Sequence, residues 1–195
     1  DLIADRYKNT LFVSVLTAMI GVPISLALGV TAAMFPGTFY DRILTFVSVS
    51  LVAAPEFFTA TLLVLLFVFA LGIGNAVVIG STDGKGVFEL ISHFALPITT
   101  LCFVIASQLI RMSRAAVLNV MSSPYIEMAI LKGVSRKRII FRHALLNAIG
   151  PIVNVVALNL AYLVTGVIVV EVYFGYNGLA TLIVQGVQTR DYVLI

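Results

Sequence analysis

Long apolar runs separated by short polar stretches dominate this chain. Residues 11–35 carry no charged side chain, and residues 43–79 carry only one, Glu56. Runs of this length allow a helix to cross a hydrocarbon core of about 30 Å. The pattern therefore predicts an all-α, polytopic bundle of transmembrane helices. We expect about four complete spans and the start of a fifth before the sequence stops, with the complete spans at residues 11–35, 43–71, 93–110 and 148–170.

The second apolar run is too long for one straight crossing. As a single helix, residues 43–79 would extend about 55 Å at 1.5 Å per residue. Pro55 predicts a kink within this run, and Gly72 and Gly74 predict the end of the helix. Residues 80–86 are rich in glycine and predict a turn on the external side.

The composition supports a membrane location. Of the 195 residues, 61% are hydrophobic and 11% are charged, which leaves too little polar material for the surface of a soluble domain. The lipid bilayer is therefore one partner. The single cysteine, Cys102, lies in an apolar run and predicts neither a disulfide framework nor a cysteine-based metal site. The net charge of +3 reflects the placement of loop charges, and we do not expect nucleic-acid binding.

Basic residues predict which loops face the cytoplasm. With loops 36–42 and 111–147 inside, eight basic residues are inside: Arg42, Arg111, Arg114, Lys132, Arg136, Lys137, Arg138 and Arg142. Four are outside: Arg6, Lys8, Lys85 and Arg190. This topology places the first residue outside, which predicts a preceding span. We therefore expect residues 1–195 to be one transmembrane core that lacks that span and most of its last one.

The polar stretch at residues 121–150 predicts a folded cytoplasmic loop. Ser123 occupies an N-cap position, and proline follows it at the first helical position. Gly133 predicts a left-handed residue that ends this helix. Ser135 can cap a second helix that leads back to the membrane near Pro151. The expected structure is a helical hairpin at the membrane surface.

The charge of this loop alone leaves two interpretations open. Five of the twelve Lys and Arg residues lie between Lys132 and Arg142, and such a cluster can simply enforce topology or contact anionic lipid. Neither role requires capped helices or a placed glycine. Glu127, surrounded by apolar residues, also has no role in a basic lipid patch. These features favour a surface for a soluble partner.

At these residues the chain resembles the membrane permease subunits of binding-protein-dependent ABC importers. Their cytoplasmic motif, Glu-Ala-Ala followed by three residues and Gly, reads here Glu127-Met128-Ala129-Ile-Leu-Lys-Gly133, with methionine in place of the middle alanine. The continuation at residues 141–148 resembles the dipeptide, oligopeptide and nickel branch. So does the segment at residues 171–179, although proline is commoner in that branch where Asn177 stands.

The resemblance implies a permease subunit in the bacterial inner membrane that forms the path for a small solute, most simply a peptide or a nickel-type substrate. Its expected partners are cytoplasmic ATPase subunits, a second permease subunit that is usually a homologue, and an external substrate-binding protein. The loop would be the coupling helix that contacts the ATPase, and its contact residues would be Tyr125, Glu127, Met128, Ala129, Lys132 and Gly133. Glu127 would either pair with the ATPase or cap the loop internally.

Other functions have weaker support in the sequence. An ion-gradient-driven secondary transporter or channel favours duplicated halves and several acids at mid-membrane, whereas this chain has no internal repeat and only Glu56 within a run. Glu56 is thus the first candidate for the translocation path, ahead of Glu171. Glu171 is expected near water at the external end of a span. Asn154 and Asn159 are expected to hydrogen-bond between helices.

The sequence predicts neither an enzyme nor a cofactor. A nucleotide-binding P-loop requires G-x-x-x-x-G-K-[ST], but Gly84-Lys85 is followed by Gly86, and Ile79 stands where the first glycine belongs. His93 and His143 lie on opposite sides of the membrane in this topology, so we expect them to share no metal. ATP hydrolysis would belong to a separate subunit.

Overall fold

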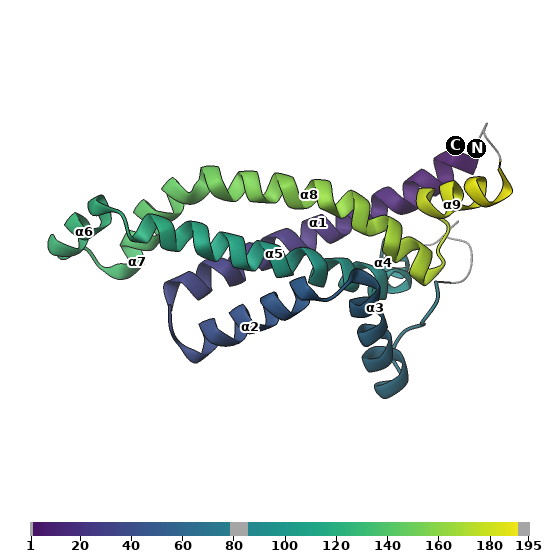
Figure 1. Ribbon diagram of the computed structural model, residues 1–195, viewed down its shortest axis with the longest axis horizontal. Helices are drawn as coiled ribbons and strands as arrows, with labels where there is room; N and C mark the ends of the chain where they lie inside the picture. Colours follow the sequence, from purple (N-terminus) through teal and green to yellow (C-terminus); the bar gives the residue numbers. More distant parts are fainter. Residues whose placement is uncertain (1, 79–85, 191–195) are drawn as a thin grey trace. The chain divides into compact units, whose positions relative to one another are not determined.

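The computed structural model describes residues 2–78 and 86–190 and is helical throughout its regular structure. The helices are α1 (Leu2–Met34), α2 (Phe39–Ala53), α3 (Glu56–Val64), η1 (Leu65–Ala70), α4 (Val87–His93), α5 (Ala95–Met121), α6 (Pro124–Leu131), α7 (Arg136–Ile139), η2 (Ile140–Ala144), α8 (Leu145–Phe174) and α9 (Leu179–Thr189) (Figure 1). The described ranges contain no strand. The predicted all-α class is confirmed.

Three helices are long and apolar enough to cross a membrane: Ile3–Met34, Ala95–Met121 and Lys137–Phe174. A fourth candidate is the pair formed by α2 with α3 and η1, if the two parts count as one broken span. The polytopic bundle expected from the sequence is thus confirmed. The first helix begins at Leu2 rather than Leu11, because the mixed charges of the first ten residues do not oppose helix formation.

Pro55 divides the second apolar run into two helices. Its φ of −59° and ψ of 149° place it before the first turn of α3, and its carbonyl accepts hydrogen bonds from the amides of Phe58 and Thr59 at 3.0 and 3.1 Å. Proline has no amide hydrogen to donate to the preceding turn, so α2 ends two residues earlier. The run therefore contains a complete break where the sequence predicted a kink.

The apolar run ends where its glycines predicted. The six-residue π-helix η1 is followed by Gly72 and Gly74, whose φ angles are +67° and +83°. Only glycine adopts such angles without strain. The predicted turn at residues 80–86 lies mostly outside the described residues, and its last residue, Gly86, is the N-cap of α4.

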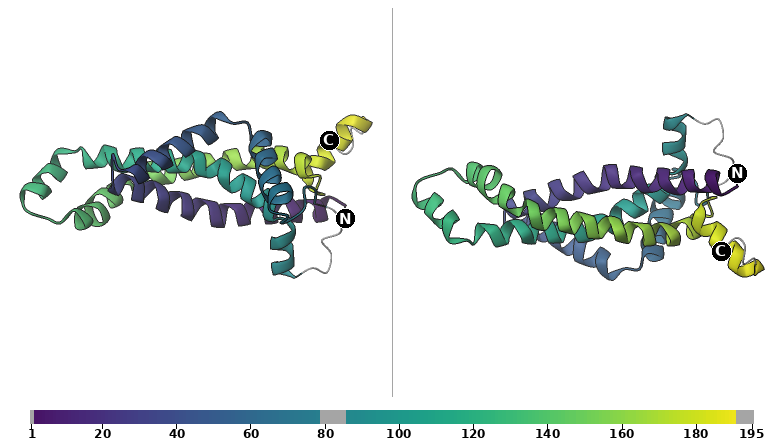
Figure 2. Two further views of the ribbon diagram at one scale, coloured as in Figure 1. Left: turned by 90° about the horizontal axis from the view of Figure 1, so that it is seen from below. Right: turned by 90° about the horizontal axis from the view of Figure 1, so that it is seen from above.

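The chain divides into two compact units, each of which contains a stretch of α1, α5 and α8. Unit 2 comprises residues Val22–Ala53 and Ile105–Leu160. Its core contains Ala33 of α1, Val117 of α5, and Ala148 and Ile152 of α8. Within this unit, α5 and α8 lie side by side and are joined at one end by α6 and α7 (Figure 2).

Small residues bring the helices of unit 2 close together. A methyl group added at Gly29 of α1 would overlap the Ser113 hydroxyl and the Ile110 carbonyl of α5. Ser113 itself is buried, and its hydroxyl bonds to the carbonyl of Leu109 within α5. Close approach at glycine and serine is typical of helix packing in membranes, where dispersion contacts replace the hydrophobic effect.

Unit 1 comprises residues Asp1–Gly21, Ala54–Val104 and Ala161–Ile195. Three aromatic rings connect its segments, since Phe94 lies 6.1 Å from Phe12 and 5.3 Å from Tyr176 between ring centroids. The amide of Val78 also donates to the carbonyl of Phe174 at 2.9 Å. These contacts fasten the loop before residue 79 to the end of α8.

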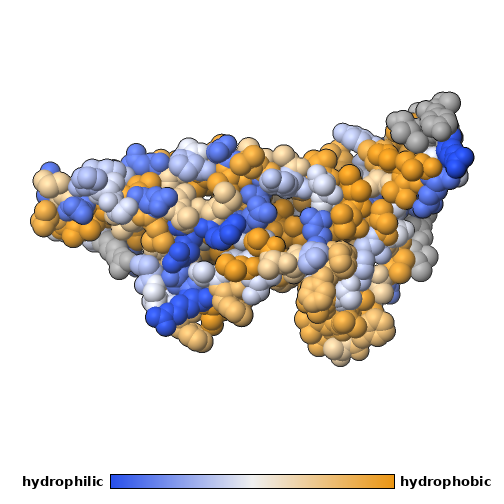
Figure 3. Space-filling model, in the orientation of Figure 1, coloured by the Kyte–Doolittle hydropathy of each residue, from blue (hydrophilic) through white to orange (hydrophobic). Residues whose placement is uncertain are grey.

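Exposed apolar side chains cover α3 and η1 of unit 1. This surface contains Phe57, Phe58, Leu62, Leu65, Leu66 and Phe69. Figure 3 shows a continuous hydrophobic area over these two elements on the face in view. Large exposed apolar surfaces of this kind require lipid or another protein around them. They fit a membrane location.

Candidate functional site

The α6–α7 hairpin, residues Pro124–Ile139, begins at the predicted position. Ser123 has extended φ and ψ angles of −81° and 148°, and its carbonyl accepts hydrogen bonds from the amides of Ile126 and Glu127. Its side chain, however, donates to the carbonyl of Val120 and does not cap α6. The prediction of the N-cap position is right, but the predicted side-chain cap is wrong. The hydroxyl instead donates its hydrogen bond to a carbonyl at the end of α5.

The turn of the hairpin is a Schellman motif centred on Gly133. Its φ is +74°, which confirms the predicted left-handed residue. The amide of Gly133 donates to Ile130 at 2.9 Å, and the amide of Val134 donates to Ala129 at 3.1 Å. These two bonds satisfy carbonyls that would otherwise be unpaired at the end of α6. The turn therefore has a defined geometry.

The hairpin has a buried side of its own. Ile126 of α6, Ile139 of α7 and Ile140 of η2 are almost completely inaccessible, and α6 packs against α7. The amide nitrogen of Asn147 in α8 donates to the Tyr125 hydroxyl of α6 at 3.0 Å. The hairpin is therefore packed internally and bonded to the helix that follows it.

Other apolar side chains of the hairpin, and of η2 next to it, are exposed. Leu131 is 80% exposed, and Met128, Ile130 and Phe141 are each more than half exposed. Exposed side chains of this size usually mark a protein–protein or membrane contact. The structure thus brings together a rigid support and an uncovered apolar surface.

The six sequence-predicted contact residues lie on this hairpin. Tyr125, Glu127, Met128, Lys132 and Gly133 are exposed, and Ala129 is half-buried. Within the described residues, Glu127 makes no hydrogen bond or ion pair. It lies in the first turn of α6, where a carboxylate is favourable beside the positive end of the helix. Among the described residues there is thus no contact that supports the internal-cap role of Glu127.

Glu56 is the first residue of α3, and its side chain lies against α8. A methyl group added at Gly166 would be 3.1 Å from the Oε1 atom of Glu56. A second contact holds the same two helices together: the Tyr173 hydroxyl donates to the Thr61 hydroxyl at 3.0 Å. Glu56 itself is half-buried and has neither a hydrogen bond nor an ion pair within the described residues.

Glu171 is the centre of a polar junction that sequence reasoning missed. It is fully buried, so its predicted position near water is wrong. Its carboxylate accepts hydrogen bonds from the Thr10 hydroxyl at 3.0 Å, and from the Thr181 amide and hydroxyl at 2.7 and 3.1 Å. Thr10 also accepts a bond from the amide of Leu179 at 2.9 Å. The Glu171 junction, defined by these four residues, joins α1, α8 and α9.

Two further bonds support the Glu171 junction. The Asn9 side chain donates to the carbonyl of Asn177 at 2.8 Å, and Arg6 donates to the Thr181 hydroxyl at 3.1 Å. The first turns of α1 are thereby bonded to the loop before α9 and to the first turn of α9 itself. The residues joined by these two hydrogen bonds are more than 160 positions apart in the chain, so no local sequence signal could reveal the bonds.

A second missed interaction lies in unit 2. Arg114 of α5 donates two hydrogen bonds to Asp41 of α2, at 2.5 and 2.8 Å. The Asp41 carboxylate is buried and also accepts a bond from the amide of Gly37 at 2.8 Å. The sequence reasoning had counted Arg114 only as a topology signal. A bidentate pair of this kind fixes the position of α2 against α5.

Asn159 also differs from its predicted role. Its side-chain amide donates to the carbonyl of Val155 in its own helix at 2.9 Å, while Asn154 is exposed. The predicted inter-helix bonds of these residues are therefore wrong.

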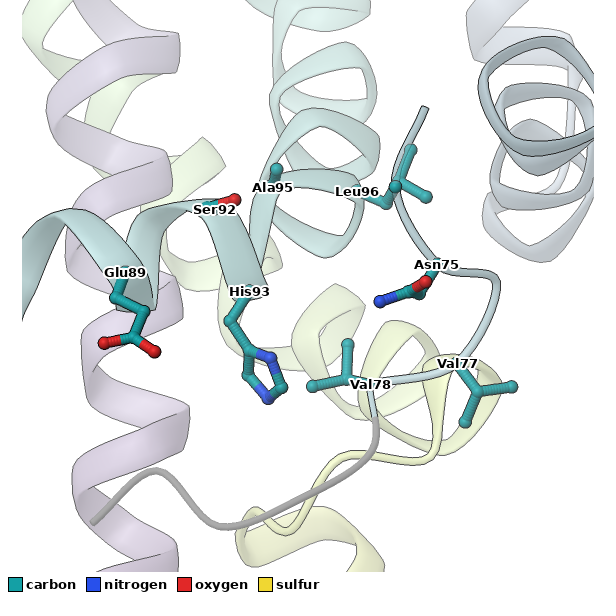
Figure 4. A pocket seen from close by; sticks show the side chains of 9 residues that line it. Asn75, Val77, Val78, Glu89, Ser92, His93, Ala95 and Leu96 are labelled. Carbon is teal, nitrogen blue, oxygen red and sulfur yellow. The ribbon is translucent and has the colours of Figure 1, made fainter. Parts of the chain in front are cut away.

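A cavity of about 230 Å³ lies at one end of unit 1. Asn75, Glu89, Ser92 and His93 contribute polar groups to it, and Val77, Val78 and Leu96 contribute apolar ones (Figure 4). This lining can offer hydrogen bonds and one negative charge. Among the described residues, no three His, Cys, Asp or Glu side chains gather as metal ligands.

Comparison with known proteins gives one family. The model of the family described as "Binding-protein-dependent transport system inner membrane component" matches residues 25–195. The chain is similar to the probable peptide ABC transporter permease protein y4tP of Sinorhizobium fredii, with 33% identity over all of this chain and 62% of that protein. It is also similar to the glutathione transport system permease protein GsiC of Escherichia coli K12, with 32% identity over all of this chain and 61% of that protein. The chain thus spans about three-fifths of the length of these relatives.

Proposed function

Because the chain belongs to the inner membrane components of binding-protein-dependent transport systems, we propose that it is the core of an ABC importer permease subunit. The protein forms part of the translocation path for a small solute. Its motion between inward-open and outward-open states is driven by ATPase subunits that bind from the cytoplasm. The names of its relatives favour a peptide-type cargo, since they include peptide and glutathione permeases.

The α6–α7 hairpin carries this proposal. A coupling element must be stiff enough to transmit force and must present a surface to its partner. The Schellman turn at Gly133 and the buried isoleucines provide stiffness, and Leu131 with Met128 provides an uncovered apolar surface. Glu127 and Lys132 supply exposed charges of both signs on the same element. This arrangement fits a groove on a soluble protein better than an anionic lipid surface.

The other proposed partners follow from the family. A second permease subunit completes the path, and the exposed apolar surface over α3 and η1 can be covered by lipid or by that subunit. An external binding protein delivers the cargo, and the polar cavity at Glu89 and His93 lies on the side that the topology places outside. Glu56 lines the translocation path. No observation on the described residues favours an ion-gradient-driven transporter.

Co-purification tests the proposal without knowledge of the cargo. The full-length permease carries an affinity tag and is extracted in mild detergent with whatever subunits bind it. We expect an ATP-hydrolysing subunit to co-purify with the unmodified protein. Leu131→Asp places a charge on the apolar contact surface and is expected to reduce the amount of this subunit by about fivefold or more, as for a residue at the centre of an interface.

Phe39→Asp is the matched control. Phe39 is 78% exposed and lies on the predicted cytoplasmic side of unit 2, but outside the hairpin. It should leave the bound ATPase unchanged. Absence of any ATP-hydrolysing subunit from the unmodified complex would contradict the proposed function. Equal retention in the Leu131 and Phe39 variants would contradict the role of the hairpin.

A further inference from the structure

Four acidic residues lie within the candidate membrane-spanning helices, and three of them have partners within the chain. Asp5 pairs with Lys8 at 3.2 Å. Asp41 receives two bonds from Arg114 and one from the backbone. Glu171 receives three bonds from Thr10 and Thr181. Glu56 differs, because no described residue donates to it or forms an ion pair with it. An acid inside a membrane protein is costly, so one without a partner among the described residues suggests a partner from elsewhere.

Gly166 of α8 leaves room for the carboxylate of Glu56. Glu56 follows the break at Pro55, and its carboxylate lies over Gly166, the one residue type that adds no side chain there. A methyl group at that position would be 3.1–3.4 Å from three atoms of the carboxyl group. The Thr61–Tyr173 bond also holds α3 on α8, five residues after Glu56 and seven after Gly166. The carboxylate is therefore held in a defined place on α8, and it remains only half-buried.

The position of Glu56 at the start of α3 explains why a negative charge is tolerated there. The first turn of a helix carries a partial positive charge, which favours a carboxylate. That effect supplies no hydrogen-bond donor to the outer oxygen atoms. A donor with a positive charge would satisfy both the charge and the oxygen atoms.

We propose that Glu56, seated on Gly166, is a cation-binding point of the translocation path that receives the ammonium group of a peptide-class cargo. This inference rests on the proposed function, since it concerns the path through the same permease. The carboxylate accepts hydrogen bonds from the ammonium group as the cargo passes Glu56. Because the contact is a single ion pair beside water, it binds briefly and releases readily.

The electrostatic field of Glu56 provides a test that does not require the cargo. In the complete importer, with Cys102 and every other native cysteine replaced by alanine, Ala54→Cys places a reporter two residues before Glu56. Reaction rates are measured with a cationic reagent (methanethiosulfonate ethyltrimethylammonium) and an anionic one (methanethiosulfonate ethylsulfonate). We expect the cation-to-anion rate ratio to exceed that of a free thiol in the same buffer by about fivefold or more, as expected for one nearby charge in a wet site. Glu56→Gln should return the ratio to the free-thiol value, and Glu56→Asp should retain most of the excess.

Three outcomes would overturn the inference. A cation-to-anion rate ratio equal to that of a free thiol, measured with Glu56 present, would mean that the charge of Glu56 is already neutralised, by a proton or by a basic residue of another subunit. Identical ratios in the Glu56 and Glu56→Gln forms would mean that the carboxylate does not act on the path. No reaction with either reagent would mean that the break is closed to water. Each of these can occur while the ATPase subunit still co-purifies, so failure of the inference is distinguishable from failure of the proposed function.

Discussion

The Thr10 hydroxyl of α1 donates a hydrogen bond to the buried carboxylate of Glu171 in α8, across 3.0 Å and 161 positions of sequence. The same hydroxyl oxygen accepts a bond from the amide of Leu179, at the start of α9. One threonine therefore connects three helices. The Glu171 junction is a structural element of unit 1, and its energetic contribution can be measured directly.

Thr10→Val keeps the shape of the side chain but removes the hydroxyl. It leaves the Glu171 carboxylate with one donor fewer and the amide of Leu179 without its acceptor. We expect the free energy of unfolding to fall by about 1–3 kcal/mol, as for loss of a bond to a charged group. Thermal unfolding in detergent measures this effect, and Thr10→Ser, which keeps the hydroxyl, should stay close to the unmodified protein. Equal losses in both variants would show that packing of the methyl group matters more than the bond.

Gly178 tests the packing around the same carboxylate. A methyl group at this position would overlap the Glu171 carboxyl group, although its φ of −121° suits any residue. Gly178→Ala is thus expected to lower the free energy of unfolding by about 1–3 kcal/mol through overpacking. Gly86→Ala is the matched control, because Gly86 is also an extended N-cap and has no atom within 4 Å of the added methyl group. If both variants unfold at the same temperature, the described position of the Glu171 carboxylate is wrong.

The contrast between Gly133 and Glu171 explains what sequence could and could not predict. The turn at Gly133 ends a helix through two local bonds, from the Gly133 amide to Ile130 and from the Val134 amide to Ala129, so its left-handed conformation follows from local chemistry. The start of α6 at Pro124 and the break at Pro55 are local in the same sense. The lengths of the apolar runs also predicted the spans, because the thickness of the membrane sets the length of a spanning helix.

The hydrogen-bond partners of Glu171 and Asp41 could be identified only from the fold. Their partners are Thr10, Thr181 and Arg114, and only the packing of distant helices brings these residues together. Hydrophobic periodicity is weak evidence in such a chain, since both the lipid-facing and the protein-facing sides of a span are apolar. Sequence reasoning consequently identified Glu56 as a candidate but could not find its position on Gly166.

The Asp41–Arg114 pair should contribute more than a surface pair. A double-mutant cycle with Asp41→Asn and Arg114→Met measures their coupling, which we expect to be about 1–3 kcal/mol because the Asp41 carboxylate is buried and the contact is bidentate. The exposed pair of Lys8 and Asp5, at 3.2 Å on one helix, serves as an internal reference and should show no measurable coupling. Similar coupling in the two pairs would contradict the buried position of Asp41.

Gly133→Val tests the stiffness of the hairpin turn. The position has open space around it, but a β-branched residue at a φ of +74° is strained by about 1–3 kcal/mol. We expect the protein to insert normally while ATP hydrolysis no longer drives uptake. The measurement is the ratio of labelled peptide taken up to ATP hydrolysed in proteoliposomes.

Gly133→Asn is the control for that experiment, because asparagine tolerates the left-handed conformation better than other residues with a side chain. It should retain much of the coupling. Undiminished uptake in the Gly133→Val variant would remove the claim that this turn transmits force.

Site-specific cross-linking can show whether the α6–α7 hairpin contacts an ATPase subunit. In the complete importer with Cys102→Ala, Leu131→Cys carries a photoactivatable thiol reagent at the most exposed apolar position of the hairpin. We predict a cross-linked product with the ATP-hydrolysing subunit, and none from Phe39→Cys labelled in the same way. A Leu131 product that contains only lipid, or equal ATPase products from both positions, would contradict the account.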